Sequence, residues 1–218
     1  MIILKNSSDI ERMREANRIL AHLFEHIRPM IQPGITTAEL DSEAELFIRS
    51  HNAVPAFKGY RGFPSTLCTS VNEEVVHGIP GTRRLRSGDL VSIDVGALHE
   101  GFYSDAARTF AVGQVSKQAL NLMETTKKAL NAGINQAYPG NRLSDISCAI
   151  QQVVESEGFS VVRDFVGHGI GKGLHEDPQI PNFGKKGNGP VLKEGMTFAI
   201  EPMVNQGSWR IEILADGW

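Results

Sequence analysis

The chain has 218 residues, enough for one sizeable domain or two small ones, with ordinary hydrophobic (41%) and charged (22%) shares. Its net charge of −3, without runs of like charge, gives no electrostatic case for nucleic acid or an anionic membrane. No stretch approaches the roughly 18–20 apolar residues of a membrane span, and the apolar N-terminal run is too short for a signal peptide. The two cysteines, Cys68 and Cys148, suit a reducing compartment. We therefore expect a soluble, cytoplasmic protein.

Two helices are predicted to open the chain. Ser8-Asp9-Ile10-Glu11 has the pattern of a capping box and precedes apolar residues at helical spacing, which predicts a helix over about residues 9–30. Pro33-Gly34 breaks the chain, and Thr36-Thr37-Ala38-Glu39 is expected to cap a second helix. A segment rich in glycine, proline and aromatic residues follows over residues 53–76, with a strand predicted at Thr66–Val71.

The next predicted element is a β-hairpin. Val91–Ala97 reads as a buried strand, Phe102–Val112 as a second strand, and a short polar turn joins them. If the loop is His99-Glu100, Asp94 lies opposite Asp105, with Cβ atoms about 4.5–5.5 Å apart. If Gly101 forms a bulge instead, the register shifts by one and the two carboxylates separate.

Two facing carboxylates require a proton or a cation between them. Asp94, flanked by Ile93 and Val95, would also be costly to bury unpaired. A metal, or a pair of metals about 3.5–4 Å apart, resolves both problems. The alternative is a surface hairpin with two solvated aspartates, which the apolar neighbours of Asp94 disfavour.

The second half of the chain repeats the order of helices followed by strands. Helices are predicted at 116–136 and 143–157, short strands near Val161 and Phe165, a glycine-rich segment around His168, a loop at 179–190, a strand over Gly195–Val204 that ends near Glu201, and a strand at Arg210–Ala215 before Asp216-Gly217-Trp218. Pro139-Gly140 stands between these helices as Pro33-Gly34 does between the first two. This weak repeat, which could also arise by chance, predicts two similar α+β halves with a site at their junction.

Carboxylates and one imidazole form the candidate chemistry. Asp94, Asp105, His168 and Glu201 would make a hard, oxygen-rich site that favours Mn, Fe(II), Co or Zn. The glycines beside His168 have the wrong spacing for a dinucleotide loop. Cys68 with His77 is a conceivable nucleophile pair, but Cys68 stands in an apolar strand, where a packed thiol is favoured.

Four motifs together give a specific resemblance. They are Val76-His77-Gly78-Ile79-Pro80, Ser92-Ile93-Asp94-Val95-Gly96 with Asp105, Gly167-His168-Gly169-Ile170-Gly171 with His175-Glu176, and Gly195-Met196-Thr197-Phe198-Ala199-Ile200-Glu201-Pro202-Met203. In order and spacing the whole chain resembles the type I methionine aminopeptidases. The resemblance implies the α+β pita-bread fold, with pseudo-twofold halves and a central antiparallel sheet covered by helices, as one catalytic domain over residues 1–218.

The resemblance also implies a reaction. The family removes the initiator methionine from new polypeptides when the next residue is small, using metal-bound hydroxide to attack the first peptide bond. Two divalent ions (Co, Mn, Fe or Zn) would be bound by Asp94, Asp105, His168 and Glu201. Glu201 would also take the water proton, His175 would stabilise the tetrahedral intermediate, and His77 would lie beside the substrate.

Further residues match the family's methionine pocket, and the resemblance also implies the partners of this chain. The pocket positions are Tyr60, Phe63, Cys68, Leu174 and Trp218, with Leu174 standing where an aromatic residue is expected. An apolar, sulfur-tolerant pocket suits the thioether of methionine. The implied partners are peptides and nascent chains with an N-terminal methionine, with the ribosome as a candidate and a monomer as the expected state.

One departure bears on activity. The family continues past the Asp-Gly-Trp turn into a hairpin that supplies a bridging glutamate ligand, whereas this sequence stops at Trp218 and Glu212 is not at the matching position. We therefore expect the chain as written to bind at most one ion tightly and to have reduced activity. Two alternatives stay open: a truncated or inactive pita-bread protein that binds peptides or a partner, and an Xaa-Pro dipeptidase.

Overall fold

The computed structural model describes every residue from Met1 to Trp218 except Asp216. It contains two compact units. The N-terminal unit comprises Ser7–Ser116, Gly171–Leu174 and Ala215–Trp218, and the C-terminal unit comprises Met1–Asn6, Lys117–Ile170 and His175–Leu214. Asp216, in the predicted Asp216-Gly217-Trp218 ending, lies outside the described residues. Among the described residues, no helix has the length and apolar content that a membrane span requires.

The N-terminal unit begins with its helices. Its elements are α1 (Ser7–Ile27), the 3-10 helix η1 (Arg28–Met30), α2 (Thr37–Ser50), β1 (Val54–Pro55), the 3-10 helix η2 (Tyr60–Gly62), β2 (Leu67–Val71), β3 (Leu90–His99) and β4 (Phe102–Ala111). The predicted capping box at Ser8 is wrong, because α1 begins at Ser7 and Ser8 lies inside its first turn. The box at Thr36 is confirmed: Thr36 Oγ1 accepts from the Glu39 amide (3.1 Å), and Glu39 Oε2 accepts from the Thr36 amide (2.7 Å).

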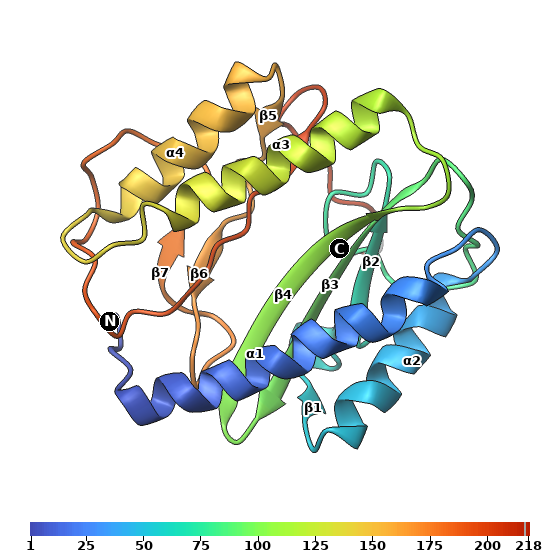
Figure 1. The fold of residues 1–218 in the computed structure, drawn as a ribbon, viewed down its shortest axis with the longest axis horizontal. Coiled ribbons are helices and arrows are strands. Elements are labelled where there is room, and N and C mark those ends of the chain that lie inside the picture. Colours follow the sequence, from blue (N-terminus) through green and yellow to red (C-terminus); the bar gives the residue numbers. More distant parts are fainter. Residues whose placement is uncertain (216) are drawn as a thin grey trace. The chain divides into compact units, whose positions relative to one another are not determined.

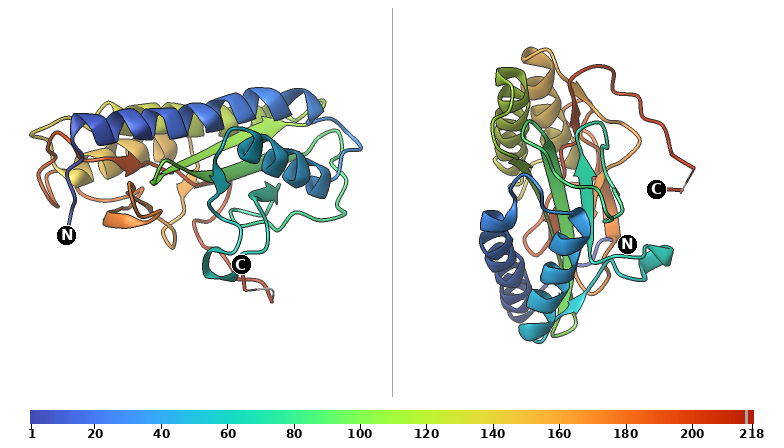
Figure 2. Two further views of the ribbon diagram at one scale, coloured as in Figure 1. Left: turned by 90° about the horizontal axis from the view of Figure 1, so that it is seen from below. Right: turned by 90° about the vertical axis from the view of Figure 1, so that its right-hand side faces the viewer.

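Strand β3 is the centre of a four-stranded antiparallel sheet. It pairs with β4 along one edge and with β1 and β2 along the other. Val91, Ile93 and Val95 are fully buried in the core that α1 and α2 form, and Figures 1 and 2 show α1 running along the two long strands. Because side chains alternate along a strand, the even-numbered residues of β3, Asp94 among them, point to the opposite face of the sheet.

The hairpin between β3 and β4 corrects the predicted register. Its two-residue loop is Glu100-Gly101, one residue later than expected, with φ angles of 48° and 80°. Positive φ at both positions is the requirement of a type I′ turn, and glycine meets it readily at the second. The pairing is therefore Gly96 with Asp105 and Asp94 with Ala107, so the prediction that Asp94 lies opposite Asp105 is wrong.

The two aspartates nevertheless share a sheet face. Moving the loop by one residue changes the pairing by two, and a shift of two leaves the face of every side chain unchanged. Asp94 and Asp105 are thus diagonal neighbours across the pair, at positions where Cα atoms are typically about 7–8 Å apart and Cβ atoms somewhat closer.

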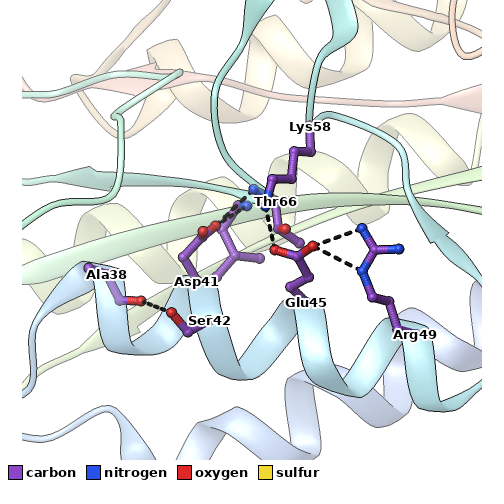
Figure 3. A network of polar contacts seen from close by, with 8 residues as sticks. Ala38, Asp41, Ser42, Glu45, Arg49, Lys58 and Thr66 are labelled. Atoms are coloured by element: carbon purple, nitrogen blue, oxygen red, sulfur yellow. Dashed lines mark hydrogen bonds and ion pairs between the residues drawn. The ribbon is translucent and has the colours of Figure 1, made fainter.

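A half-buried carboxylate, that of Asp41, joins α2 to the start of β2. Asp41 Oδ1 accepts hydrogen bonds from the backbone amides of Thr66 (2.9 Å) and Leu67 (2.7 Å), as Figure 3 shows beside the separate cluster of Glu45, Arg49 and Lys58. Burial raises the pKa of Asp41, against the two amide hydrogen bonds, which lower it. The contact fixes where β2 begins, and therefore where Cys68, its second residue, lies.

The C-terminal unit repeats the order of helices and then strands. Its elements are α3 (Lys117–Ile134), α4 (Leu143–Ser156), β5 (Ser160–Val161), β6 (Gly167–Gly169), β7 (Glu176–Ile180), β8 (Phe198–Ala199) and β9 (Val204–Asn205). The helices α3 and α4 pack side by side (Figure 1). The strands form an antiparallel sheet in the order β7-β6-β8 and a separate pair, β5-β9. Pro139-Gly140 lies between α3 and α4, as Pro33-Gly34 lies between α1 and α2.

Two strand predictions in this unit are wrong in extent. The predicted strand over Gly195–Val204 is reduced to Phe198–Ala199 and the start of β9, and Glu201 lies in the irregular segment between them. Pro202 lacks a backbone N–H and cannot donate to a strand ladder, which accounts for the interruption. The predicted strand at Arg210–Ala215 is absent, and these described residues have no regular secondary structure.

Candidate active site

His168 is held on the middle strand of the three-stranded sheet. It lies on β6 opposite Gln179 of β7 and Ala199 of β8. The neighbouring pair, Gly169 with Phe198, lies on the other face, where Phe198 packs against the core beneath α4. His168 therefore points away from that core, although its side chain is only 7% exposed.

Two contacts fix the tautomer and direction of the His168 ring. Nδ1 lies 2.8 Å from the carbonyl oxygen of Gly169, which can only accept, so Nδ1 carries a proton. Nε2 lies 3.1 Å from Oε1 of Glu201. When the imidazole is neutral, Nε2 carries a lone pair beside the carboxylate oxygen, so both atoms are available as ligands of one cation.

This donor set fits a divalent cation. A ring nitrogen whose partner nitrogen donates to a carbonyl is the usual arrangement of a metal-binding histidine. Two ligand atoms each about 2.1 Å from one ion and at right angles are about 3.0 Å apart, close to the separation of Nε2 and Oε1. His168 and Glu201 can therefore serve as adjacent ligands without rearrangement.

Glu201 owes its position to a residue that the sequence analysis did not single out. Asn182 is fully buried, and its Nδ2 donates to the backbone carbonyl oxygen of Glu201 at 2.7 Å. Asn182 falls within the predicted loop at 179–190, where an asparagine is ordinary. No local pattern separates this buried side chain from the exposed Asn188 in the same loop.

His175 lies beside His168. Their ring centroids are 4.2 Å apart at an interplanar angle of 44°. His175 is exposed, whereas His168 is buried, so the pair places one solvent-accessible imidazole next to the candidate ligand. An exposed imidazole is available to donate a hydrogen bond to a molecule from solvent.

The remaining candidate ligands belong to the N-terminal unit. Asp94 and Asp105 are both half-buried and lie on the sheet face away from α1 and α2. Cys68 lies opposite Asp94 across the β2–β3 pair and shares that face. Burial raises the pKa of the Cys68 thiol, and the charges of Asp94 and Asp105 raise it further. The buried Cys68 is therefore a protonated thiol at neutral pH, which argues against a nucleophile pair with His77.

Three of the predicted substrate-binding side chains in this unit, those of Phe63, His77 and Trp218, lie close together. The Trp218 ring stands edge-on to Phe63 at 5.0 Å and to His77 at 5.9 Å between centroids. Burial lowers the pKa of His77, so its imidazole is neutral at neutral pH. The backbone of Phe63 bonds to the Tyr60 carbonyl (2.9 Å). Leu174 is buried at 3% exposure.

Comparison with known proteins identifies the family. The sequence pattern of metallopeptidase family M24 matches residues 11–215, and the chain belongs to that family. Within it, the chain is 56% identical over 218 residues to a methionine aminopeptidase of Clostridium perfringens, covering all of this chain and 88% of that protein.

Solved structures agree with that assignment. The crystal structure of methionine aminopeptidase from Rickettsia prowazekii is 42% identical and superposes with a TM-score of 0.99, covering all of this chain and 88% of that one. A prolidase from Pyrococcus furiosus is less similar, at 27% identity and a TM-score of 0.81, covering 92% of this chain and 57% of that one. The predicted α+β pita-bread fold and the predicted class of enzyme, a metal-dependent aminopeptidase, are confirmed.

Proposed function

We propose that this chain removes the N-terminal methionine from peptides and newly made polypeptides when the next residue is small. The observation that carries the proposal is the pairing of His168 Nε2 with Glu201 Oε1, in a ring whose tautomer Gly169 fixes. The methionine aminopeptidases among its relatives support the choice of substrate.

Asp94, Asp105, His168 and Glu201 are proposed to bind divalent ions, one tightly and a second more weakly, with Co, Mn, Fe and Zn as the candidates. Three carboxylates and one imidazole form a hard, oxygen-rich donor set of the kind these ions prefer. Metal ions bound there would lower the pKa of water and polarise the carbonyl group of the first peptide bond.

The side chains of this chain divide the remaining work. Glu201 accepts the proton of the attacking water, which a carboxylate beside a cation can do at neutral pH. His175, exposed next to His168, donates a hydrogen bond to the oxygen on which negative charge develops. His77, kept neutral because burial lowers its pKa, lies beside the substrate and exchanges hydrogen bonds with it.

A pocket for the methionine side chain is proposed from the aromatic cluster of the N-terminal unit. Phe63 and Trp218 stand edge-on to each other, and aromatic edges and faces make favourable contacts with a thioether sulfur. The residues assigned to this pocket are Tyr60, Phe63, Cys68, Leu174 and Trp218. A buried, protonated thiol at Cys68 keeps the pocket uncharged.

The cellular setting is proposed on chemical grounds. Both cysteines are free, as a reducing cytoplasm would keep them. We propose that the two units act as a single catalytic domain in a monomer, and that nascent chains at the ribosome are substrates.

The test is methionine release from matched peptides. The purified chain, supplied with Mn²⁺ or Co²⁺, is expected to release methionine from Met-Ala-Ser and much less from Met-Arg-Ser, with loss of release in a chelator. Glu201→Gln is expected to abolish release, and Glu212→Gln, which alters an exposed carboxylate of the same unit, to leave it unchanged. Equal cleavage of the two peptides would contradict the proposed specificity.

The same assay separates the two alternatives. A binding protein without catalysis would retain peptide and release no methionine with either metal. An Xaa-Pro dipeptidase would cleave Met-Pro in preference to Met-Ala-Ser.

A further inference from the structure

A buried ion pair in the C-terminal unit involves Glu176, the residue that follows His175 in the chain. Lys5 Nζ is 2.5 Å from Oε2 of Glu176, and their side chains are only 4% and 10% exposed. Resting on the proposed function, we infer that Lys5 is a positioning residue for His175 and acts through Glu176.

The ammonium group of Lys5 is held on more than one side. Besides Glu176, it donates to the backbone carbonyl oxygen of Ile3 at 3.2 Å. Removing one partner of a buried ion pair leaves an uncompensated charge, which is much more disruptive than losing an exposed pair. Replacing Lys5 would therefore remove a charged partner from the largely buried Glu176 carboxylate.

The backbone of Lys5 is fixed independently of its side chain. Its amide donates to the carbonyl oxygen of Gly195 at 2.8 Å. Gly195 has a φ of +86°, and a Cβ atom there would lie 2.7 Å from the Lys5 carbonyl oxygen. This close approach fixes the position of the Lys5 backbone, and the Lys5 side chain in turn holds the Glu176 carboxylate.

Glu176 links the fixed Lys5 to the two histidines, His175 and His168. It immediately follows His175 and pairs with Gly169, the residue whose carbonyl oxygen orients His168. The His175 ring in turn contacts the His168 ring, with centroids 4.2 Å apart. His175 itself precedes β7 and is exposed, so the anchored Glu176, next to it in the chain, supports its backbone on one side.

A positioning role and a purely structural role differ in how they combine with loss of His175. If Lys5 acts through His175, removing His175 first leaves Lys5 nothing to position. If Lys5 only maintains the fold, its loss lowers activity by the same factor in both backgrounds. A double-mutant cycle distinguishes the two.

The experiment measures kcat, KM, bound Mn²⁺ and melting temperature for the full chain, for Lys5→Met, for His175→Ala and for the double variant. We expect Lys5→Met to lower kcat about tenfold with KM and Mn²⁺ content nearly unchanged, but to lower it less than about twofold in the His175→Ala background. Lys193→Met, which alters an exposed lysine of the same unit, serves as the matched control. It is expected to leave kcat, KM and Mn²⁺ content unchanged.

Lys5→Arg keeps the charge in a bulkier head group and covers the case in which Lys5→Met does not fold. Its smaller loss of kcat is also expected to vanish with His175→Ala. Equal factors in both backgrounds, or a change in melting temperature alone, would overturn the positioning role and leave the proposed function intact. Failure of the unaltered chain to release methionine would overturn both.

Discussion

Nδ1 of His168 and the carbonyl oxygen of Gly169 lie 2.8 Å apart, within a single dipeptide. This contact assigns the proton to Nδ1 and leaves Nε2 to meet Glu201. We expect His168→Ala to weaken Mn²⁺ binding by at least about tenfold, because a ligand and its orientation are lost together. Calorimetric titration measures the change, with His22→Ala on the exposed side of α1 as the control. Unchanged Mn²⁺ affinity in His168→Ala would remove His168 from the metal site.

Asn182 donates a hydrogen bond to the backbone of Glu201, so its loss is expected to lower both the Mn²⁺ affinity and the stability of the protein. Asn182→Ala leaves the Glu201 carbonyl oxygen without its donor, at an expected cost of about 1–3 kcal/mol of unfolding free energy. Loss of such a supporting contact is also expected to weaken Mn²⁺ binding about 10–100-fold. Asn188→Ala, an exposed change in the same loop, should do neither. Urea unfolding and Mn²⁺ titration of both variants check the prediction, and similar behaviour of the two would contradict it.

The sequence predicted the helices and long strands well because their patterns are local. Amphipathic spacing and the Thr36–Glu39 box located α2, and an apolar, β-branched run located β3. The hairpin loop was misplaced by one residue because the φ requirement of a type I′ turn outweighs the polarity of His99. Placing Gly101 at the second loop position would have given the correct register.

The sequence could predict only those residues of the candidate site that stand in sequence motifs. Asp94, Asp105, His168 and Glu201 each stand within a short, contiguous sequence motif, but the side chains of Asn182 and Lys5 contact residues far along the chain. Such contacts depend on which side chains the fold happens to bury together, and no periodicity records them. The interruption of the strand before Pro202 could have been predicted from the missing N–H group of proline.

Cys68 should resist alkylation in the folded protein. Burial raises the pKa of its thiol, and the charges of Asp94 and Asp105 act in the same direction, so almost no thiolate is present at neutral pH. Brief treatment with iodoacetamide is expected to modify the half-buried Cys148 and leave Cys68 unmodified until the protein is unfolded in urea. Peptide mass spectrometry reads both sites in one digest. Rapid labelling of Cys68 in the folded chain would show that its surroundings do not suppress the thiolate.

Asp41 offers a test in which charge and hydrogen bonding can be separated. Both backbone amides, those of Thr66 and Leu67, donate to the same oxygen, Oδ1. Asparagine retains an oxygen at that position, so Asp41→Asn can keep both hydrogen bonds, which Figure 3 shows, while removing the half-buried charge. Asp41→Ala loses both, at an expected cost of about 1–3 kcal/mol. We expect Asp41→Asn to be at least as stable as the unaltered chain at pH 7.

The stability difference between Asp41→Asn and the unaltered chain is expected to change with pH in one direction. Burial is the main cause that raises the folded-state pKa of Asp41 above its ordinary value of 3.8, so ionisation costs stability in the folded state. The favourable contribution of the protonated carboxyl is fully present below 3.8 and is lost as the pH rises through the raised folded-state pKa. The advantage of Asp41→Asn should therefore shrink as the pH is lowered from 7 toward 4. Urea unfolding curves across that range measure it, and an advantage that grows toward acid pH would mean that the hydrogen bonds to Asp41 outweigh its desolvation.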